Sequence, residues 1–432
     1  TFYTKVTDKE GNVVLEPKML SGLVAVPPSK SAAHRAVICA ALAQGVSVME
    51  PVELSNDIRA TIDCVKELGA AVSLIGKRLT IDGKMMFTNT EATLDCGESG
   101  STLRFMIPVV GAGNVKAKFI GHGRLPERPI GIYLECLPKA GVNCVTEGGL
   151  PLSINGQLKP GIFEVPGNVS SQFITGLLLA LPLLKADSEI VVTSSLESKS
   201  YIDMTLSAMN RFGVTAIETE NGYKVYGNQS YKPQHLNIEG DWSQAAFFLA
   251  AGALGGNVSI ENLDTASYQG DKAIYQLLRQ FGADITINGQ VLSCKHNKLN
   301  GIEIDAENIP DLVPILAVVA ALAEGTTTIT GAARLRIKES DRLHAITEGL
   351  NKLGADITEL PDGLRINGVK SLNGGAVQGY NDHRIVMALS VAATRATEPV
   401  IITDAESINK SYPSFFEDYN NLGGNANVIN MG

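Results

Sequence analysis

The sequence predicts an α/β fold built from six copies of one unit, divided into two domains of three copies each. Helix starts recur every 70 or 71 residues, at Ser31, Ser101, Ser171, Asp241, Asp311 and Asp382. Glycines that end a second type of helix recur 69 or 72 residues apart, at Gly69, Gly141, Gly213, Gly282, Gly354 and Gly423. This repeat is longer than those of the common solenoids, so each copy has room for two helices and its own sheet.

Each copy is expected to form a strand, a buried helix, a strand, an amphipathic helix and a strand pair. The segments after the helix starts, such as 315–320, are apolar on nearly every side, which predicts buried helices. The recurring glycines occupy the C′ position, where glycine adopts the left-handed conformation that ends a helix. Strand pairs usually follow, as at 283–292. The seam between the third and fourth copies is expected near 228–237, a linker-like segment that contains Pro233.

Composition excludes several classes of protein. The chain has 432 residues, 44% of them hydrophobic, and a formal net charge of −9. An acidic protein is a poor partner for nucleic acid or for an acidic membrane surface. No apolar run is long enough to span a bilayer, and 1–17 lacks a signal-peptide pattern. The six cysteines make no Cys-x-x-Cys pair, which favours a reduced, cytoplasmic protein.

Two cations, Lys30 and Arg35, lie at the first helix start, and capping of the helix does not require either of them. Two prolines precede Ser29-Lys30-Ser31, and Arg35 follows one turn later. Ser29 or Ser31 can cap the helix. The N-terminal end of a helix attracts anions and disfavours cations, so Lys30 and Arg35 suggest a bound anion. Taken alone, the start is better explained as a capped core helix with two surface cations.

Two loops add further cations. Arg124 and Arg128 lie on a loop stiffened by two prolines, where arginine forks match carboxylate or phosphate oxygens. Taken alone, they could equally be surface arginines paired with Glu127. Segment 334–342 holds four cations and two carboxylates before an amphipathic helix. It is either a solvated charged face or a phosphate clamp with a proton-handling carboxylate. Phosphate-loop, dinucleotide-loop and metal-ligand patterns do not occur, so we expect no cofactor and no metal.

Eight short motifs occur in the order typical of one enzyme family. They are 28–35 (Pro-Ser-Lys-Ser-x-x-x-Arg), 100–104 (Gly-Ser-Thr-x-Arg), 124–129 (Arg-x-x-x-Arg-Pro), 170–172 (Ser-Ser-Gln), 198–203 (Ser-Lys-x-Tyr-Ile-Asp), 309–311 (Ile-Pro-Asp), 338–342 (Lys-Glu-x-Asp-Arg) and 381–384 (Asn-Asp-His-Arg). Together they resemble the EPSP synthases (3-phosphoshikimate 1-carboxyvinyltransferases) over essentially the whole chain.

The resemblance implies a two-domain, inside-out α/β barrel-like fold. Each domain would hold three βαβαββ-type units, with the helices buried and the sheets outside. The chain would cross twice between the domains. We therefore expect one domain over 23–237 and the other over 1–22 plus 238–432, with the active site in the cleft between them.

The resemblance also implies the reaction. An enzyme of this family transfers the enolpyruvyl group of phosphoenolpyruvate to the 5-hydroxyl of shikimate 3-phosphate by addition and elimination, within aromatic amino-acid biosynthesis. Both substrates are small polyanions, as the cations suggest. Asp311 would be the base and Glu339 the acid at the methylene carbon. Lys30 would stabilise charge and shuttle a proton.

The substrate-binding residues follow by motif. Shikimate 3-phosphate would be held by Ser31, Arg35, Ser170, Ser171, Gln172, Ser198, Tyr201 and Lys338. Phosphoenolpyruvate would be held by Lys30, Gly100, Arg124, Gln172, Arg342, Arg384 and Lys410. We expect a monomer, and Gly100 leaves room for the inhibitor glyphosate.

Two alternatives remain at this point. The sister enolpyruvyl transferase that acts on UDP-N-acetylglucosamine uses a cysteine on a mobile loop, and segment 111–124 contains none. A catalytically inactive anion-binding relative would have lost Asp311 or Glu339, and both are present.

Overall fold

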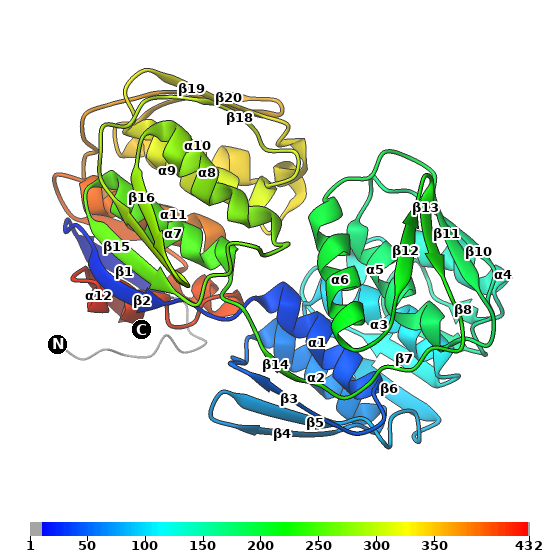
Figure 1. Ribbon diagram of the computed structural model, residues 1–432. Coiled ribbons are helices and arrows are strands. Elements are labelled where there is room, and N and C mark those ends of the chain that lie inside the picture. Colours follow the sequence, from blue (N-terminus) through cyan, green and yellow to red (C-terminus); the bar gives the residue numbers. More distant parts are fainter. Residues whose placement is uncertain (1–10, 431–432) are drawn as a thin grey trace. The chain divides into compact units, whose positions relative to one another are not determined.

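The computed structural model describes residues 11–430, without the side chain of Asn430. The chain forms two compact units, coloured along the sequence in Figure 1. Unit 2 runs from Pro28 to Ile238, and unit 1 comprises the described residues up to Pro27 and from Glu239 onward. The expected domain boundary after residue 22 falls inside strand β2 (Ser21–Ala25). Because β2 pairs with a strand of unit 1 along its whole length, unit 1 extends to Pro27.

Unit 2 consists of helices that alternate with short strands. Its helices are α1 (Lys30–Leu42), α2 (Asn56–Glu67), α3 (Gly100–Ala112), η1 (Leu125–Glu127), α4 (Gly131–Lys139), α5 (Ser171–Ala180), η2 (Leu181–Leu183) and α6 (Lys199–Arg211). Its strands are β3 (Val46–Glu50), β4 (Ala71–Ile75), β5 (Arg78–Asp82), β6 (Glu91–Asp95), β7 (Lys116–Ile120), β8 (Asn143–Val145), β9 (Leu152–Asn155), β10 (Ile162–Val165), β11 (Ser188–Val192), β12 (Ala216–Thr219), β13 (Gly222–Val225) and β14 (His235–Asn237).

Unit 1 repeats this arrangement. Its helices are α7 (Trp242–Leu254), η3 (Gly270–Lys272), α8 (Ala273–Phe281), η4 (Pro310–Leu312), α9 (Val313–Ala321), η5 (Ala333–Ile337), α10 (Arg342–Lys352), α11 (His383–Ala392), η6 (Ala393–Arg395), η7 (Ala405–Lys410) and α12 (Phe415–Asn421). Besides β2, its strands are β1 (Gly11–Glu16), β15 (Asn257–Glu261), β16 (Asp284–Asn288), β17 (Val291–Lys295), β18 (Glu303–Asp305), β19 (Thr326–Thr330), β20 (Asp356–Leu360), β21 (Gly363–Asn367), β22 (Gly375–Val377), β23 (Val400–Ile402) and β24 (Asn425–Asn430).

One sheet topology recurs throughout the described residues. In sheet β6-β7-β9-β8, the strands before and after α3 pair in parallel, and β9 then joins them antiparallel between β7 and β8. The other sheets have the orders β14-β3-β5-β4, β10-β11-β13-β12, β16-β17-β15-β2, β18-β19-β21-β20 and β22-β23-β1-β24. The predicted α/β fold with βαβαββ-type units is therefore confirmed.

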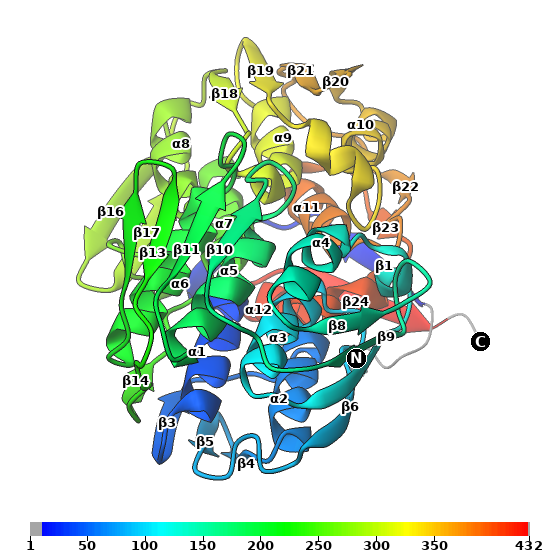
Figure 2. The same cartoon turned by 90° about the vertical axis from the view of Figure 1, so that its right-hand side faces the viewer.

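Two strands complete sheets that belong to other copies of the repeat. Strand β2 precedes α1 in the chain but pairs in parallel with β15 of unit 1. Strand β14 precedes α7 but pairs in parallel with β3 of unit 2, beside which it lies in Figure 2. Strand β2 therefore completes a sheet of unit 1, and β14 completes the equivalent sheet of unit 2. Each described sheet has four strands as a result.

Within each unit the helices lie inside and the sheets outside (Figure 1). In unit 1, α7, α9 and α11 pack against one another. Every residue of α9 is buried, because its sequence offers no polar face. In unit 2, α3 packs closely on α5 at Gly176, where a Cβ atom would lie 2.4 Å from the carbonyl oxygen of Arg104. The described residues include no helix long and apolar enough to cross a membrane.

Candidate active site

Lys30 lies in the first turn of α1, which is capped by a serine side chain. The Ser29 side chain accepts a hydrogen bond from the backbone N–H of Ala32 at 3.1 Å, which makes Ser29 the cap. Lys30 is therefore the first helical residue, and Ser31 the second. The Lys30 ammonium donates to Asp57 Oδ2 at 2.9 Å, and 29% of its side chain remains exposed. Lys30 is thus a partly accessible cation with a fixed counter-ion.

Arg35 is buried between α1 and α6. It donates to the Thr205 hydroxyl (2.8 Å), to the carbonyl oxygen of Ser31 (2.9 Å) and to that of Tyr201 (3.1 Å). Its guanidinium also lies over the Phe105 ring, 5.1 Å from the centroid. Burial lowers the pKa of Arg35 to about 10, so the side chain stays charged at neutral pH. Arg35 therefore fixes Ser31 and Tyr201, two of the predicted site residues, through their backbone.

Gln172 at the start of α5 is oriented by a buried arginine. Arg104 donates to Gln172 Oε1 at 2.9 Å and lies 3.4 Å from the Ser170 hydroxyl. The Gln172 amide nitrogen in turn donates to the Ser101 hydroxyl at 2.9 Å. Ser170 also caps α5, accepting from the Gln172 N–H at 3.2 Å. Arg104, the last residue of the 100–104 motif, therefore orients Gln172.

A proline explains how the backbone at Arg104 is stabilised. Pro108 lies four residues further along α3 and has no N–H to donate to the carbonyl oxygen of Arg104. The buried Tyr133 hydroxyl donates to that oxygen at 2.6 Å instead. Phe173, next to Gln172, also places its carbonyl oxygen 2.9 Å from the Tyr133 hydroxyl. Tyr133 therefore ties α3 to α5 at the position of Gln172.

The remaining predicted residues of unit 2 lie on its loops and helix starts. Arg124 and Arg128 are exposed and flank η1. Gly100 is the first residue of α3, and a Cβ atom there would lie 2.8 Å from Nη1 of Arg128. Ser171 is buried in the first turn of α5. Ser198 is buried before α6 in the left-handed conformation, with φ of 54°.

In unit 1, Arg342 gathers three carboxylates. The side chain of Arg342 is 2% exposed at the start of α10. It donates to Asp311 Oδ1 at 3.0 Å, to Glu339 Oε2 at 2.7 Å and to Asp382 Oδ2 at 2.8 Å. Burial alone would lower the pKa of Arg342, but Asp382, Glu339 and Asp311 raise it well above its usual value. A permanently charged guanidinium thus connects both predicted catalytic carboxylates.

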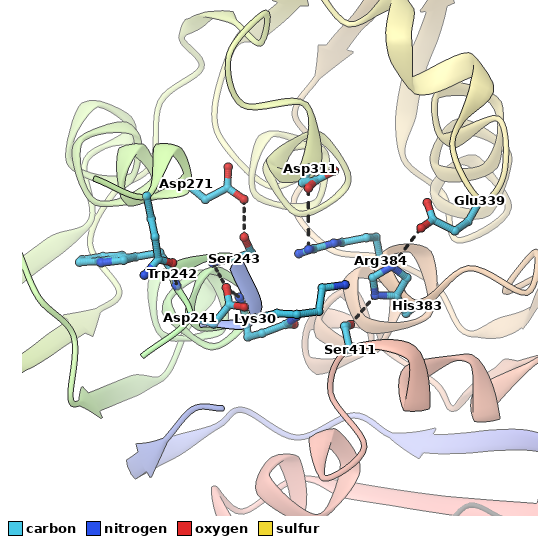
Figure 3. Close-up of polar contacts among 12 residues, drawn as sticks. Lys30, Asp241, Trp242, Ser243, Asp271, Asp311, Glu339, His383, Arg384 and Ser411 are labelled. Atoms are coloured by element: carbon cyan, nitrogen blue, oxygen red, sulfur yellow. Dashed lines mark hydrogen bonds and ion pairs between the residues drawn. The ribbon is translucent and has the colours of Figure 1, made fainter. Parts of the chain in front are cut away.

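Asp311 departs from the pattern of its equivalents in the repeat. Asp241 caps α7 and Asp382 caps α11 through side-chain bonds to backbone N–H groups. Asp311 lies in η4, one turn before α9, and makes no capping bond. Its carboxylate points instead to Arg342 and to Arg384, whose Nη2 lies 3.8 Å from Asp311 Oδ2 (Figure 3). At the start of α9, therefore, the Asp311 carboxylate has no capping role.

Glu339 is surrounded by proton donors. Its Oε1 lies 3.3 Å from Lys410 Nζ and 3.9 Å from His383 Nε2. Figure 3 shows His383 between Glu339 and Ser411, whose hydroxyl contacts Nδ1 of the ring. Burial lowers the pKa of His383 to about 4, so the ring is neutral at pH 7. The side chain of Glu339 is 30% exposed, which leaves it accessible to a ligand.

Both predicted catalytic carboxylates are ionised in the free protein. Burial would raise the pKa of Asp311, but Arg384, Lys338 and Arg342 hold it below its usual range. Burial would also raise the pKa of Glu339, but the His383 hydrogen bond and Arg342 hold it well below its usual range. A base is ready in this state, whereas an acid has to gain its proton when substrate binds.

A third carboxyl group lies near Asp311. Asp271 in η3 accepts a hydrogen bond from the Ser243 hydroxyl at 2.5 Å (Figure 3). Burial and the charge of Asp311 raise the pKa of Asp271 to about 7, against the opposing effect of Arg384. Nη1 of Arg384 is buried and has no hydrogen-bond partner within the part of the chain that the structure describes. Arg384 is therefore a cation with donor capacity left for a ligand.

One group of side chains has the composition of a metal site. Ligand atoms of Glu339, Asp382 and His383 lie within 4.8 Å of one another. Arg342 already donates to both carboxylates, and its positive charge opposes a cation there. The group is best described as an ion-pair network.

Sixteen predicted residues thus divide between the units. Unit 2 holds Lys30, Ser31, Arg35, Gly100, Arg124, Ser170, Ser171, Gln172, Ser198 and Tyr201, and unit 1 holds Asp311, Lys338, Glu339, Arg342, Arg384 and Lys410. Asp57, Asp382 and His383 were not among the predicted site residues. Asp382 and His383 belong to the 381–384 motif. Asp57 belongs to no motif, and its place in the first turn of α2, behind the Ser55 cap, is common for an acidic residue.

Fold and site together are those of an enzyme, with cations and carboxylates gathered at its helix starts. The family model for EPSP synthase (3-phosphoshikimate 1-carboxyvinyltransferase) matches residues 14–419. A 3-phosphoshikimate 1-carboxyvinyltransferase of Clostridium perfringens is 49% identical over 95% of this chain and 98% of its own length. That of Clostridioides difficile is 45% identical over 98% of this chain and 100% of its own.

A solved structure of EPSP synthase from Acinetobacter baumannii has a TM-score of 0.86 at 27% identity, over 97% of this chain and 100% of that one. The chain belongs to the EPSP synthase (3-phosphoshikimate 1-carboxyvinyltransferase) family. The family is one of transferases in the shikimate pathway, which serves aromatic amino-acid biosynthesis.

Proposed function

We propose that this chain transfers the enolpyruvyl group of phosphoenolpyruvate to the 5-hydroxyl of shikimate 3-phosphate. The observation that carries the proposal is the match of family and relatives over nearly the whole chain, with both candidate carboxylates in place. Acceptance of UDP-N-acetylglucosamine is not favoured, because the relatives named above share the 3-phosphoshikimate name and segment 111–124 lacks cysteine.

The reaction needs five changes of bonding in two steps. In the addition, the 5-hydroxyl loses a proton, its oxygen bonds to C2 of the enol, and C3 gains a proton to become a methyl group. In the elimination, the methyl group loses a proton and the C2–O bond to phosphate breaks. The products are 5-enolpyruvylshikimate 3-phosphate and inorganic phosphate. Two carboxylates and a lysine are enough to move these protons.

Asp311 is suited to take the hydroxyl proton, since it is ionised and makes no capping bond. Glu339 has to be protonated before it can donate to the methylene carbon. Bound phosphate and carboxylate groups offset the charges of Arg342 and Lys410, and a nearby anion raises the pKa of a carboxylate. Substrate binding would therefore prepare Glu339 as the acid. Lys30 would offset charge on the transferring group.

Substrate contacts are proposed residue by residue from the family motifs. Shikimate 3-phosphate would contact Ser31, Arg35, Ser170, Ser171, Gln172, Ser198, Tyr201 and Lys338. Phosphoenolpyruvate would contact Lys30, Gly100, Arg124, Gln172, Arg342, Arg384 and Lys410. The orphaned Nη1 of Arg384 and the partly exposed ammonium groups of Lys30 and Lys410 support a role in anion binding.

The function is tested by continuous measurement of phosphate release. The protein is mixed with phosphoenolpyruvate and either shikimate 3-phosphate or UDP-N-acetylglucosamine. Release that requires shikimate 3-phosphate supports the proposal. Release with only the nucleotide sugar supports the sister activity, and no release above background with either acceptor contradicts both. Near-native activity in millimolar glyphosate would contradict the expected sensitivity to that inhibitor.

We further propose a monomeric, cytoplasmic protein. All six cysteines are unpaired in the structure, which suits a reducing compartment. Light scattering during size-exclusion chromatography tests the monomer, and a mass near 45.8 kDa is expected. A mass near twice that value would contradict it.

A further inference from the structure

Helices α1 and α2 are joined by two polar contacts, one helical turn apart. The first is the ion pair between Lys30 Nζ and Asp57 Oδ2, at 2.9 Å. The second joins His34 Nδ1 to the Thr61 hydroxyl, at 2.7 Å. His34 follows Lys30 by four residues, and Thr61 follows Asp57 by four, so each pair lies on one face of its helix. The two contacts therefore fix both the separation and the register of the helix starts.

Thr61, which makes the second contact, also contacts Thr102 of α3. The Thr61 hydroxyl lies 2.7 Å from the Thr102 hydroxyl, which donates to the Ser99 hydroxyl at 2.7 Å. Ser99 caps α3 by accepting from the Thr102 N–H at 3.1 Å. The residue between Ser99 and Ser101 is Gly100, a proposed contact of phosphoenolpyruvate. A buried chain of hydroxyl groups thus connects three helix starts of unit 2.

The two contacts differ in charge. Burial lowers the pKa of His34 to about 3, while Asp57 acts to raise it and Lys30 and Arg35 to lower it further. The His34 ring is therefore neutral at pH 7 and packs edge-on against Phe105. The contact between Lys30 and Asp57 is ionic. The Lys30 side chain is partly exposed, whereas the Asp57 side chain is only 11% exposed. The carboxylate is held inside the unit and the ammonium extends outward from it.

We propose that Asp57 is a positioning residue, which acts through Lys30 and is itself fixed by the His34–Thr61 contact. This inference rests on the proposed function, because Lys30 is placed there on phosphoenolpyruvate. A lysine side chain has several rotatable bonds and a point charge, so a fixed counter-ion decides where its ammonium lies. Misplacement of a substrate contact by about 1 Å can cost roughly 100-fold in rate. Asp57 would thereby contribute to catalysis without touching substrate.

The test compares three variants by steady-state kinetics. Asp57→Asn keeps the shape and removes the charge, Asp57→Glu keeps the charge, and Asp63→Asn makes the same change at an exposed position of α2. We expect Asp57→Asn to lower kcat roughly 10- to 100-fold and to raise KM for phosphoenolpyruvate, with KM for shikimate 3-phosphate within about twofold. Asp57→Glu should recover part of the loss, and Asp63→Asn should match the wild type. Wild-type kinetics for Asp57→Asn, or an equal loss for Asp57→Glu, would overturn the proposal.

A second measurement needs no substrate. Limited acetic anhydride modifies neutral amines, and mass spectrometry of the peptide that contains Lys30 gives the rate. Loss of a carboxylate 2.9 Å away should make Lys30 react roughly tenfold faster in Asp57→Asn, since opposite charge favours the ammonium form. Equal rates of Lys30 acetylation in the wild type and in Asp57→Asn would contradict the ion pair between Lys30 and Asp57. If the wild type released no phosphate, the proposed function would fail while this difference in labelling still stood.

Discussion

Replacement of Arg342 by lysine tests whether the fork of its guanidinium, rather than its charge, holds unit 1 together at the site. The side chain is 2% exposed and makes four hydrogen bonds to three carboxylates, between 2.7 and 3.2 Å long. Lysine keeps the positive charge but donates from a single nitrogen atom. Arg342→Lys therefore leaves at least one carboxylate without its donor.

The expected loss follows from these bonds. A hydrogen bond to a charged group contributes about 1.5–3 kcal/mol, and the loss of two such bonds predicts a fall of about 3–6 kcal/mol in the free energy of unfolding. Breaking a buried ion pair costs a similar amount. Urea unfolding followed by circular dichroism measures this change.

Arg336→Lys is the matched control. Arg336 also bridges two carboxylates, those of Asp341 and Glu359, but its side chain is 29% exposed. Because solvent screens such pairs, we expect that control to cost less than about 1 kcal/mol. An equal fall for Arg342→Lys and Arg336→Lys would refute the reasoning.

Three further changes test the packing and the buried charges. Burial raises the pKa of Asp271 to about 7, so the folded protein keeps this proton to higher pH than the unfolded chain does, and the free energy of unfolding falls as pH rises from about 4 to about 7. Asp271→Asn should remove that fall. Urea midpoints that change with pH in the same way in the wild type and in Asp271→Asn would contradict this prediction. Gly176→Ala should cost about 1–3 kcal/mol, since its Cβ would lie 2.4 Å from the Tyr133 hydroxyl, whereas Gly161→Ala in open space should cost little; equal midpoints would exclude the predicted collision. Tyr133→Phe should cost about 1–3 kcal/mol by leaving the carbonyl oxygen of Arg104 without its donor, and an unchanged thermal midpoint would show that this oxygen finds another.

The repeat made most of the fold predictable. Apolar runs and glycines at a constant spacing specify helices and strand pairs locally, and these are short-range features of the chain. The exchange of β2 and β14 was harder to foresee in detail. Either strand suits either sheet by its own pattern, and the choice depends on pairing over more than 180 residues of sequence, such as His235 with Val48. The sequence predicted two crossings between the domains, and the boundary it placed after residue 22 lies within β2.

The sequence predicted which residues belong to the site better than it predicted which residues they contact. The family motifs pointed to Lys30, Arg342 and Arg384, but the sequence could not tell which cations the protein itself uses for structure. Arg104 orients Gln172, and this contact joins α5 to α3 across 68 residues. Spacing alone gave Asp311 the position of a helix cap, and only the η4 turn shows that its carboxylate makes no such bond.

Nuclear magnetic resonance of a single reaction mixture tests the central claim most directly. With equal amounts of phosphoenolpyruvate and shikimate 3-phosphate, the ³¹P spectrum follows inorganic phosphate and the ¹H spectrum follows the vinyl protons of the product. We predict one enolpyruvyl ether for each phosphate released, and loss of both signals in Asp311→Asn. Phosphate without the ether would indicate simple hydrolysis, and unchanged phosphoenolpyruvate would indicate no reaction; either result would contradict the transfer.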